Sequence, residues 1–290
     1  MSIYNIEFIT PLFSRGAYED RPEVRSSSIR GQFHWWFRAL GGNFTDERAI
    51  FGGIGKPAFA SKVVIRVSDL HGNAGTVNTL PHKTGGQASP KTAFQIGTHF
   101  QLHVLARYGG LQERLQSALS RTLETWLMLG TLGLRSTRAA GSFRWKPAEP
   151  NEEGVIQSPA DFATYEVRCL RLIDQAPLRF ALLSESYSNP EEARKVVSDT
   201  LGGRDDKSGQ TDLERLNHPL GKIFGGRKTS PLRFRIVGIG PEFRIAAVWD
   251  ARANITGNKL SDLTGIINLL KKRKPALGEQ LYHSKLLPSV

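Results

Sequence analysis

Apolar residues alternate with polar ones in some stretches of the chain and recur with helical spacing in others. Alternation rich in β-branched and aromatic side chains predicts strands at residues 3–13, 62–67 and 94–107, the last as one strand or a hairpin. Apolar spacing of three and four predicts helices at residues 28–40 and 111–129. With a short strand near residues 143–145, the predicted order is β-α-β-β-α-β, the order of the ferredoxin-like or RRM-like fold.

Similar patterns return after residues 147–163, which are rich in Pro, Glu, Asn and Gly and are interpreted as a linker. Strand-like runs are predicted within residues 164–183, a helix at 190–201, paired strands at 232–239 and 243–249, and a last helix at 260–272. The expected fold class is therefore α+β, with two ferredoxin-like (RRM-like) domains in tandem. The expected domains are residues 1–150 and 151–290.

A short internal repeat supports this organisation. The tetrapeptide Ile-Phe-Gly-Gly stands at residues 50–53 and again at residues 223–226. Each copy precedes an alternating strand, at residues 61–67 and 230–236 respectively. Because the tetrapeptides occupy matching places in two similar element orders, an internal duplication is favoured over chance.

The charge of the chain favours a polyanionic partner. Its 290 residues include 39 Lys and Arg against 27 Asp and Glu, a formal net charge of +12. Phosphates attract such a surface and release counterions on binding, but ribosomal, DNA-binding and RNA-processing proteins share this property. The single cysteine, Cys169, excludes an internal disulfide and a cysteine-rich zinc site. With no signal peptide or membrane-length apolar run in the sequence, a cytoplasmic location is expected.

The predicted helix at residues 28–40 has an apolar face and a basic face. The apolar face carries Ile29, Phe33, Trp36 and Leu40. The basic face repeats every four residues, and no acid lies between Glu23 and Asp46. Like charges at this spacing repel, so an external polyanion is expected to neutralise them, with Ser27 or Ser28 as the helix cap. We therefore predict RNA contacts by Arg25, Ser28, Arg30, Gly31, His34 and Arg38.

Glycines, arginines and hydroxyl side chains are interspersed at residues 130–142. Exposed main-chain N–H groups, cations and small donors together form a loop that can cradle phosphates. The alternative is an ordinary turn after a helix. This segment predicts RNA contacts by Arg135, Ser136 and Arg138, and Lys56 completes the predicted set.

Other binding and catalytic motifs fail at specific positions. Residues 52–56 are similar to a P-loop, but Ile50 occupies the place of its first glycine and Pro57 replaces the Ser or Thr. His99 and His103 lie four apart on one predicted strand without a carboxylate pattern, which is more typical of structural histidines. No catalytic constellation is recognisable, so no catalytic residue, metal or cofactor is expected.

Residues 9–13, Arg25, and residues 28–31, 35–39 and 50–53 together resemble the start of a known family. This family comprises the first-numbered subunits of Cmr complexes, the type III-B CRISPR effectors, within the RAMP (repeat-associated mysterious protein) superfamily. The match is specific over residues 6–67. Residues 130–143 are similar to the Gly-rich loop of the superfamily, although residues 139–141 depart from its usual Arg-Gly-aromatic-Gly run.

The resemblance implies a non-catalytic subunit of an antiviral ribonucleoprotein, built from two ferredoxin-like RAMP domains. It implies a place at the head of the complex, near the 3′ end of the guide RNA, where the subunit helps to capture target RNA. The implied partners are guide RNA (crRNA), target RNA and other RAMP subunits, with no membrane. One alternative is a RAMP endoribonuclease that processes CRISPR repeat RNA, with His34 as candidate acid or base. Another is a standalone RNA chaperone.

Overall fold

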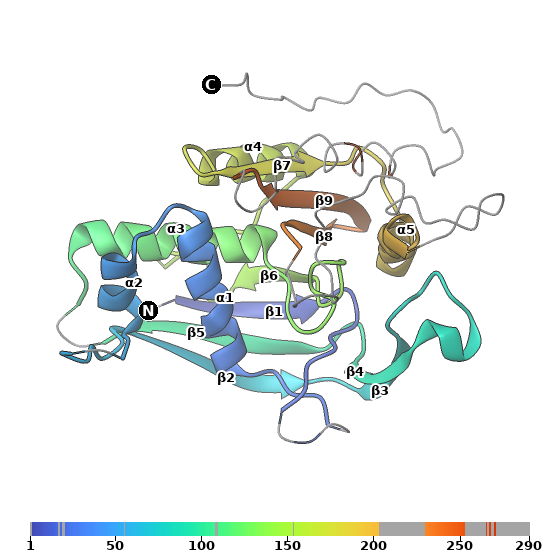
Figure 1. The fold of residues 1–290 in the computed structure, drawn as a ribbon, viewed down its shortest axis with the longest axis horizontal. Coiled ribbons are helices and arrows are strands. Elements are labelled where there is room, and N and C mark those ends of the chain that lie inside the picture. The colour runs from blue at the N-terminus through green and yellow to red at the C-terminus, as the bar shows by residue number, and fades with distance from the viewer. Residues whose placement is uncertain are drawn as a thin grey trace.

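The computed structural model describes residues 2–16, 18, 21–54, 56–107, 110–152, 154–202 and 230–252, together with residues 265, 267 and 270. Figure 1 shows the arrangement of the helices and strands. The first half contains β1 (Ser2–Phe8), α1 (Ser26–Ala39), α2 (Phe44–Phe51), β2 (Val63–His71), β3 (Ala74–Asn78), β4 (Pro90–Phe94), β5 (His99–Ala106), α3 (Glu113–Leu129) and β6 (Phe143–Pro147), with a 3-10 turn at Gly85–Ala88. The second half contains α4 (Phe162–Leu172), β7 (Leu178–Leu182), α5 (Pro190–Gly202), β8 (Leu232–Ile239) and β9 (Glu242–Asp250).

The first half forms one antiparallel sheet with the strand order β2-β5-β1-β6. Helix α1 connects β1 to β2, and helix α3 connects β5 to β6, so the element order and the sheet order are those of a ferredoxin-like fold. Strands β3 and β4 form a separate hairpin between β2 and β5 in the sequence. The predicted α+β class is confirmed.

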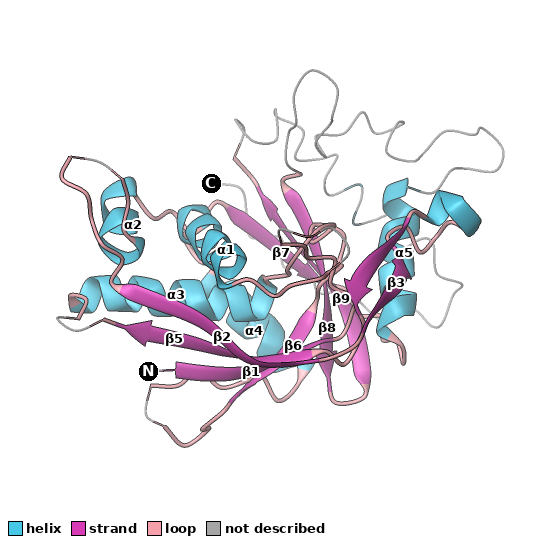
Figure 2. Cartoon of the chain, turned by 90° about the horizontal axis from the view of Figure 1, so that it is seen from below, coloured by secondary structure: helices cyan, strands magenta, loops and turns pink. Residues whose placement is uncertain are grey.

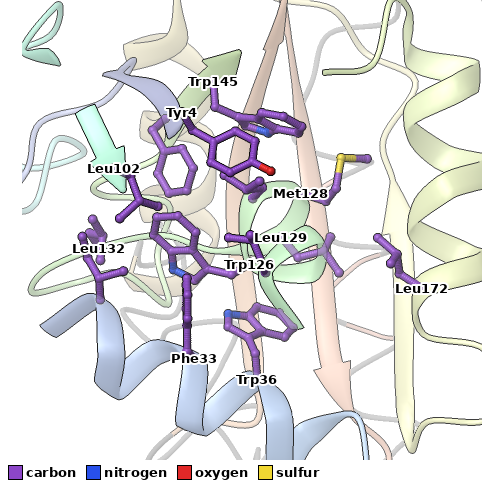
Figure 3. Close-up of a cluster of buried hydrophobic side chains, with 14 of the residues drawn as sticks. Tyr4, Phe33, Trp36, Leu102, Trp126, Met128, Leu129, Leu132, Trp145 and Leu172 are labelled. Carbon is purple, nitrogen blue, oxygen red and sulfur yellow. The ribbon is translucent and has the colours of Figure 1, made fainter. Parts of the chain in front are cut away.

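The core of the first half lies between the sheet and the two helices α1 and α3. Tyr4, Ile6 and Phe8 alternate along β1 and are fully buried, as expected for one face of a half-buried strand. Phe33 points from α1 toward Trp126 of α3, and the two ring centroids are 5.4 Å apart (Figure 3). The apolar stripe predicted for α1 is confirmed, with Ile29, Phe33 and Trp36 buried and Leu40 packed partly against the core.

The second half repeats this plan as far as the structure describes it. Strands β7, β9 and β8 form an antiparallel sheet in this order, with α5 between β7 and β8 in the chain. The helix predicted at residues 190–201 and the hairpin predicted at residues 232–249 are confirmed. Residues 265, 267 and 270 are helical within the predicted last helix, and its other residues lie outside the described part, as does the second Ile-Phe-Gly-Gly.

The strand-like runs predicted at residues 164–183 are wrong over their first part, where α4 begins at Phe162. The carboxylate of Asp161 caps this helix by accepting a hydrogen bond from the N–H of Thr164 (2.7 Å). Tyr165 and Cys169 are buried against α3, and the Tyr165 hydroxyl donates to the carbonyl of Met128 (2.7 Å). Packing against α3 therefore stabilises a helix where β-propensity favoured a strand, and only Leu178–Leu182 forms one.

Buried polar side chains join the two halves. The guanidinium of Arg235 on β8 is buried and donates to the carbonyls of Leu127, Gly130 and Phe143 in the first half. The Ser142 hydroxyl accepts a hydrogen bond from the N–H of Ile236 (3.0 Å). In Figure 2, the β8–β9 hairpin lies close to β6 and the end of the first sheet. The boundary expected at residue 150 falls between β6 and α4 and stays a proposal.

The starts of β2 and β8 share a local motif. The Ser61 hydroxyl bonds to both the N–H and the carbonyl of Val63, at 3.2 and 2.7 Å. The Ser230 hydroxyl bonds in the same way to Leu232, at 3.2 and 2.9 Å. Since these serines occupy the same place in the sequence repeat, the geometry supports an internal duplication that makes β2 and β8 equivalent.

Candidate RNA interface

The basic face of α1 packs against α2, an element that the sequence analysis did not predict. The Nδ1 atom of His34 lies 2.5 Å from Oε1 of Glu47, which is buried on α2. The Nε atom of Arg38 lies 3.5 Å from the same oxygen, although the Arg38 side chain remains 60% exposed. Helix α2 thus supplies one acid to this basic face, which the sequence analysis did not expect, and RNA contacts by Arg30, His34 and Arg38 stay a prediction.

Arg30 is likewise held by α2. Its guanidinium donates a hydrogen bond to the carbonyl of Phe51, the last residue of α2, and the side chain is half-buried. This bond satisfies a carbonyl at the helix end, which would otherwise lack an intrahelical partner. Arg30 is thus a structural contact between the two helices, which the sequence alone did not reveal.

The beginning of α1 is more accessible. The helix starts at Ser26 with Arg25 in the N-cap position and no side-chain cap, so the caps predicted at Ser27 or Ser28 are wrong. Arg25, Ser28 and Gly31 are exposed, and a Cβ atom added at Gly31 would meet no atom within 4 Å. Lys56 is exposed in the loop after α2. RNA contacts by these residues stay a prediction.

The glycines of the segment at residues 130–142 allow close packing of the main chain. A Cβ added at Gly141 would lie 2.0 Å from the Leu132 carbonyl oxygen, and one at Gly133 would lie 2.5 Å from the Phe13 carbonyl oxygen. Seven N–H groups of the segment donate to partners inside the protein, namely those of Gly130, Leu132, Leu134, Arg138, Ala140, Gly141 and Ser142. The expectation of a loop with freely exposed N–H groups is therefore wrong for these seven groups, and ligand contacts from this segment would have to come mainly from its side chains.

Three arginines form a cluster at this segment, which we call the arginine cluster: Arg135, Arg138 and Arg194. Arg135 is exposed at the surface with φ of 59°, and Arg138 is half-buried. The pKa of Arg135 is lowered mainly by partial burial and further by the nearby charge of Arg194. The pKa of Arg138 is likewise lowered mainly by partial burial and further by the charge of Arg135. Among the described residues, no carboxylate pairs with either side chain.

Arg194 comes from α5, in the second half of the chain. Its side chain is buried, with Nη1 2.9 Å from Oε2 of Glu191 and Nη2 donating to the carbonyl of Asn78 (3.0 Å). Its guanidinium also lies 5.4 Å from the centroid of the Phe13 ring. The sequence analysis missed this residue because Glu191 three positions earlier is typical of an ordinary surface pair on a helix. No local pattern indicates that α5 meets residues 130–142.

Ser136, from the same segment, and Arg233, from β8, both have contacts inside the protein. Ser136 is half-buried, and its carbonyl accepts a hydrogen bond from the Thr131 hydroxyl (2.8 Å). Arg233 on β8 is 8% exposed and stacks 3.8 Å over the ring of Trp35. Burial lowers the pKa of Arg233 to about 10, and its side chain has no hydrogen-bond partner among the described residues. The contact between residues 137–138 and β8 therefore has an arginine on each element, Arg138 and Arg233.

Comparison with known proteins confirms the family resemblance. Residues 5–144 match the RAMP superfamily. The chain is 28% identical over 141 residues to CRISPR system Cmr subunit Cmr1-1 of Pyrococcus furiosus, covering 42% of this chain and 40% of that protein. It is 51% identical over 43 residues to Cmr1-2 of the same organism, covering 15% of this chain and 23% of that protein. The aligned parts thus span less than half the length of these curated relatives.

Two solved structures share the fold over most of their length. The crystal structure of Cmr1 from Pyrococcus furiosus in its apo form matches with a TM-score of 0.57 and 21% identity, covering 86% of this chain and 88% of that one. A chain of the type III-B Cmr-beta complex bound to cognate target RNA matches with a TM-score of 0.59 and 8% identity, covering 93% and 99%. These structures share the arrangement of two ferredoxin-like units in tandem, and the match to the RAMP superfamily covers residues 5–144, just under half of the chain. Within the described residues, no helix is long and apolar enough to cross a membrane.

Proposed function

We propose that this chain is a non-catalytic RNA-binding subunit of a type III-B CRISPR (Cmr) effector complex. In this proposal it lies at the head of the complex, near the 3′ end of the guide RNA, beside other RAMP subunits. There it helps to capture target RNA for antiviral defence. The relatives named above are Cmr1 subunits, and one structural neighbour belongs to a complex bound to target RNA.

The arginine cluster is the observation that carries the proposal. In the described part of the chain, no carboxylate pairs with the exposed Arg135 or the half-buried Arg138, and an unpaired charge in a partly buried position costs free energy that a bound anion offsets. A phosphate supplies that anion, and arginine binds it through charge-assisted hydrogen bonds in a fixed geometry. Such contacts are made to the RNA backbone, so they imply little sequence preference.

The candidate acid or base of the alternative, a repeat-processing nuclease, is His34, and this side chain is engaged inside the protein. A general acid or base must reach the proton that it transfers, within hydrogen-bond distance or through one water. His34 directs Nδ1 at Glu47 and packs its ring 4.7 Å from that of Phe51. This arrangement ties the imidazole to α2, which favours a structural role.

Co-expression with the neighbouring RAMP subunits and a CRISPR array tests the proposal. We expect the chain to co-purify with those subunits and with guide RNA, and to crosslink to RNA through peptides that contain residues 135–138. Purified alone, it is expected to leave repeat RNA and target RNA uncut, with or without divalent metal. Cleavage that His34→Ala abolishes would favour the nuclease, and purification without RAMP partners would favour a standalone chaperone.

A further inference from the structure

The outer edge of β2 carries main-chain groups without a partner strand. Among the strands that the structure describes, β2 is at the end of the four-stranded sheet and pairs with β5 alone (Figure 1). The N–H of Arg107 donates to the carbonyl of Lys62 (2.8 Å), which fixes the hydrogen-bonding register between the two strands. Alternation along an antiparallel ladder then turns the main-chain groups of Val63, Ile65 and Val67 toward the open edge.

The equivalent edge of β8 has partners at its first three outward N–H groups. Its outward groups belong to Leu232, Phe234 and Ile236, which match Val63, Ile65 and Val67 in the repeat. Leu232 bonds to the Ser230 hydroxyl, as Val63 bonds to that of Ser61.

The next two outward N–H groups of β8 donate to the segment at residues 137–142. That of Phe234 donates to the carbonyl of Thr137 (3.2 Å), and that of Ile236 donates to the Ser142 hydroxyl (3.0 Å). The turns at residues 135–141 thus contact β8 through a single parallel bridge between Arg138 and Phe234.

No such cover exists on β2 within the described residues. In the described part of the chain, the N–H groups of Ile65 and Val67 donate no hydrogen bond at the open edge, unlike those of Phe234 and Ile236 on β8. Unpaired edges of this kind bind other chains by adding a strand. The duplication therefore marks the β2 edge as a position that an extended segment can occupy.

A basic groove runs along this edge. An open hollow of about 540 Å³ lies between residues 24–27 at the start of α1 and residues 65–70 of β2. A second hollow of about 250 Å³ continues past Arg30 and residues 63–65 to Arg107. The lining residues include Arg25, Arg66, Arg30 and Arg107, against the single acid Asp69. The groove therefore complements a negatively charged occupant.

We propose that the free edge of β2 binds an extended acidic segment of a neighbouring protein as a fifth strand of the sheet. Main-chain hydrogen bonds to Ile65 and Val67 fix its register, and the arginines that line the groove bind its carboxylates. A protein strand is favoured over RNA because the edge offers alternating N–H and carbonyl groups, which match another peptide main chain. The proposal does not depend on RNA binding by the arginine cluster.

A capped peptide that alternates Glu and Val over six residues is the probe for the full-length chain. We expect saturable binding by fluorescence anisotropy, with slowed hydrogen exchange at the amides of Ile65 and Val67. Two matched probes separate the contribution of main-chain hydrogen bonds from that of charge. One has alternate main-chain nitrogens methylated, and the other has Lys in place of Glu. Each is expected to bind at least ten-fold more weakly.

Ile65→Pro removes one outward N–H and is expected to weaken the peptide three- to ten-fold, whereas Ile65→Val leaves affinity unchanged. If Ile65→Pro lowers the melting temperature, the methylated peptide decides alone, because it leaves the protein intact. Equal binding of the methylated peptide would overturn the proposal, as would no binding at millimolar concentration. Protection of the same two amides by a single-stranded RNA oligonucleotide, and not by the peptide, would also overturn it.

Discussion

The imidazole of His34 on α1 and the carboxylate of Glu47 on α2 are 2.5 Å apart, and this pair anchors α2 to the basic face of α1. Glu47 is 7% exposed, so its loss removes a buried, charge-assisted hydrogen bond. We expect Glu47→Ala to lower the free energy of unfolding by roughly 2–3 kcal/mol in chemical denaturation. Glu149→Ala, which removes an exposed acid, is the control and should change stability by less than about 0.5 kcal/mol.

The same variant tests where RNA binds. If the face of α1 bound RNA, removal of Glu47 would release positive charge and raise RNA affinity. Because we assign binding to the arginine cluster, Glu47→Ala should leave the affinity per folded molecule within about two-fold. A clear gain in RNA affinity would instead indicate that RNA binds the basic face of α1.

Arg30 and Arg25 both lie at the beginning of α1, but their loss is expected to change stability by different amounts. Arg30 donates to the carbonyl of Phe51, whereas Arg25 is exposed at the start of α1. Arg30→Ala is therefore expected to cost about 1–2 kcal/mol of stability, after discounting for partial exposure, and Arg25→Ala less than about 0.5 kcal/mol. Thermal melts of the two variants decide this, and equal melting temperatures would show that the bond to α2 contributes nothing.

Cys169 predicts a pH dependence of stability. Burial raises the pKa of its thiol to about 12, whereas an unfolded cysteine titrates near ~8.5. Between these values the unfolded chain loses a proton that the folded chain keeps, so stability is full below pH ~8.5 and falls as pH rises. From pH 8 to 10.5 the wild type should lose roughly 2–3 kcal/mol more than Cys169→Ala, measured by urea denaturation. Parallel curves for the two proteins would contradict the burial of this thiol.

The sequence predicted elements whose signals are local. The apolar stripe of α1 and the hairpin at residues 232–249 depend on spacing within one element, and both were confirmed. Helix α2 was missed although Asn43 caps it by accepting from the N–H of Asp46 (2.9 Å), a pattern visible in the sequence. Helix α4 also had a signal, since Tyr165, Cys169 and Leu172 have helical spacing.

The site was less predictable because it depends on contacts between distant elements. The charges of Arg30, His34 and Arg38 appeared free only as long as α2 was unknown. Arg135 and Arg138 were predicted from their glycine-rich context, but their neighbour Arg194 lies on a helix of the other half. Contact between these arginines depends on tertiary packing, which cannot be predicted from the periodicity within one helix or strand.

The salt dependence of RNA affinity in the double variant Arg135→Gln/Arg138→Gln tests the central claim most directly. With ~4–6 phosphates neutralised, log K of the wild type for single-stranded RNA should fall by ~3–4 per decade of salt. Loss of two phosphate contacts should reduce that slope by ~1.4, at ~0.7 per phosphate. The control, Arg114→Gln/Arg144→Gln, removes two exposed arginines already paired with Asp46 and Glu7 and should keep the wild-type slope. If the cluster variant keeps that slope while the control reduces it, the arginine cluster does not bind RNA.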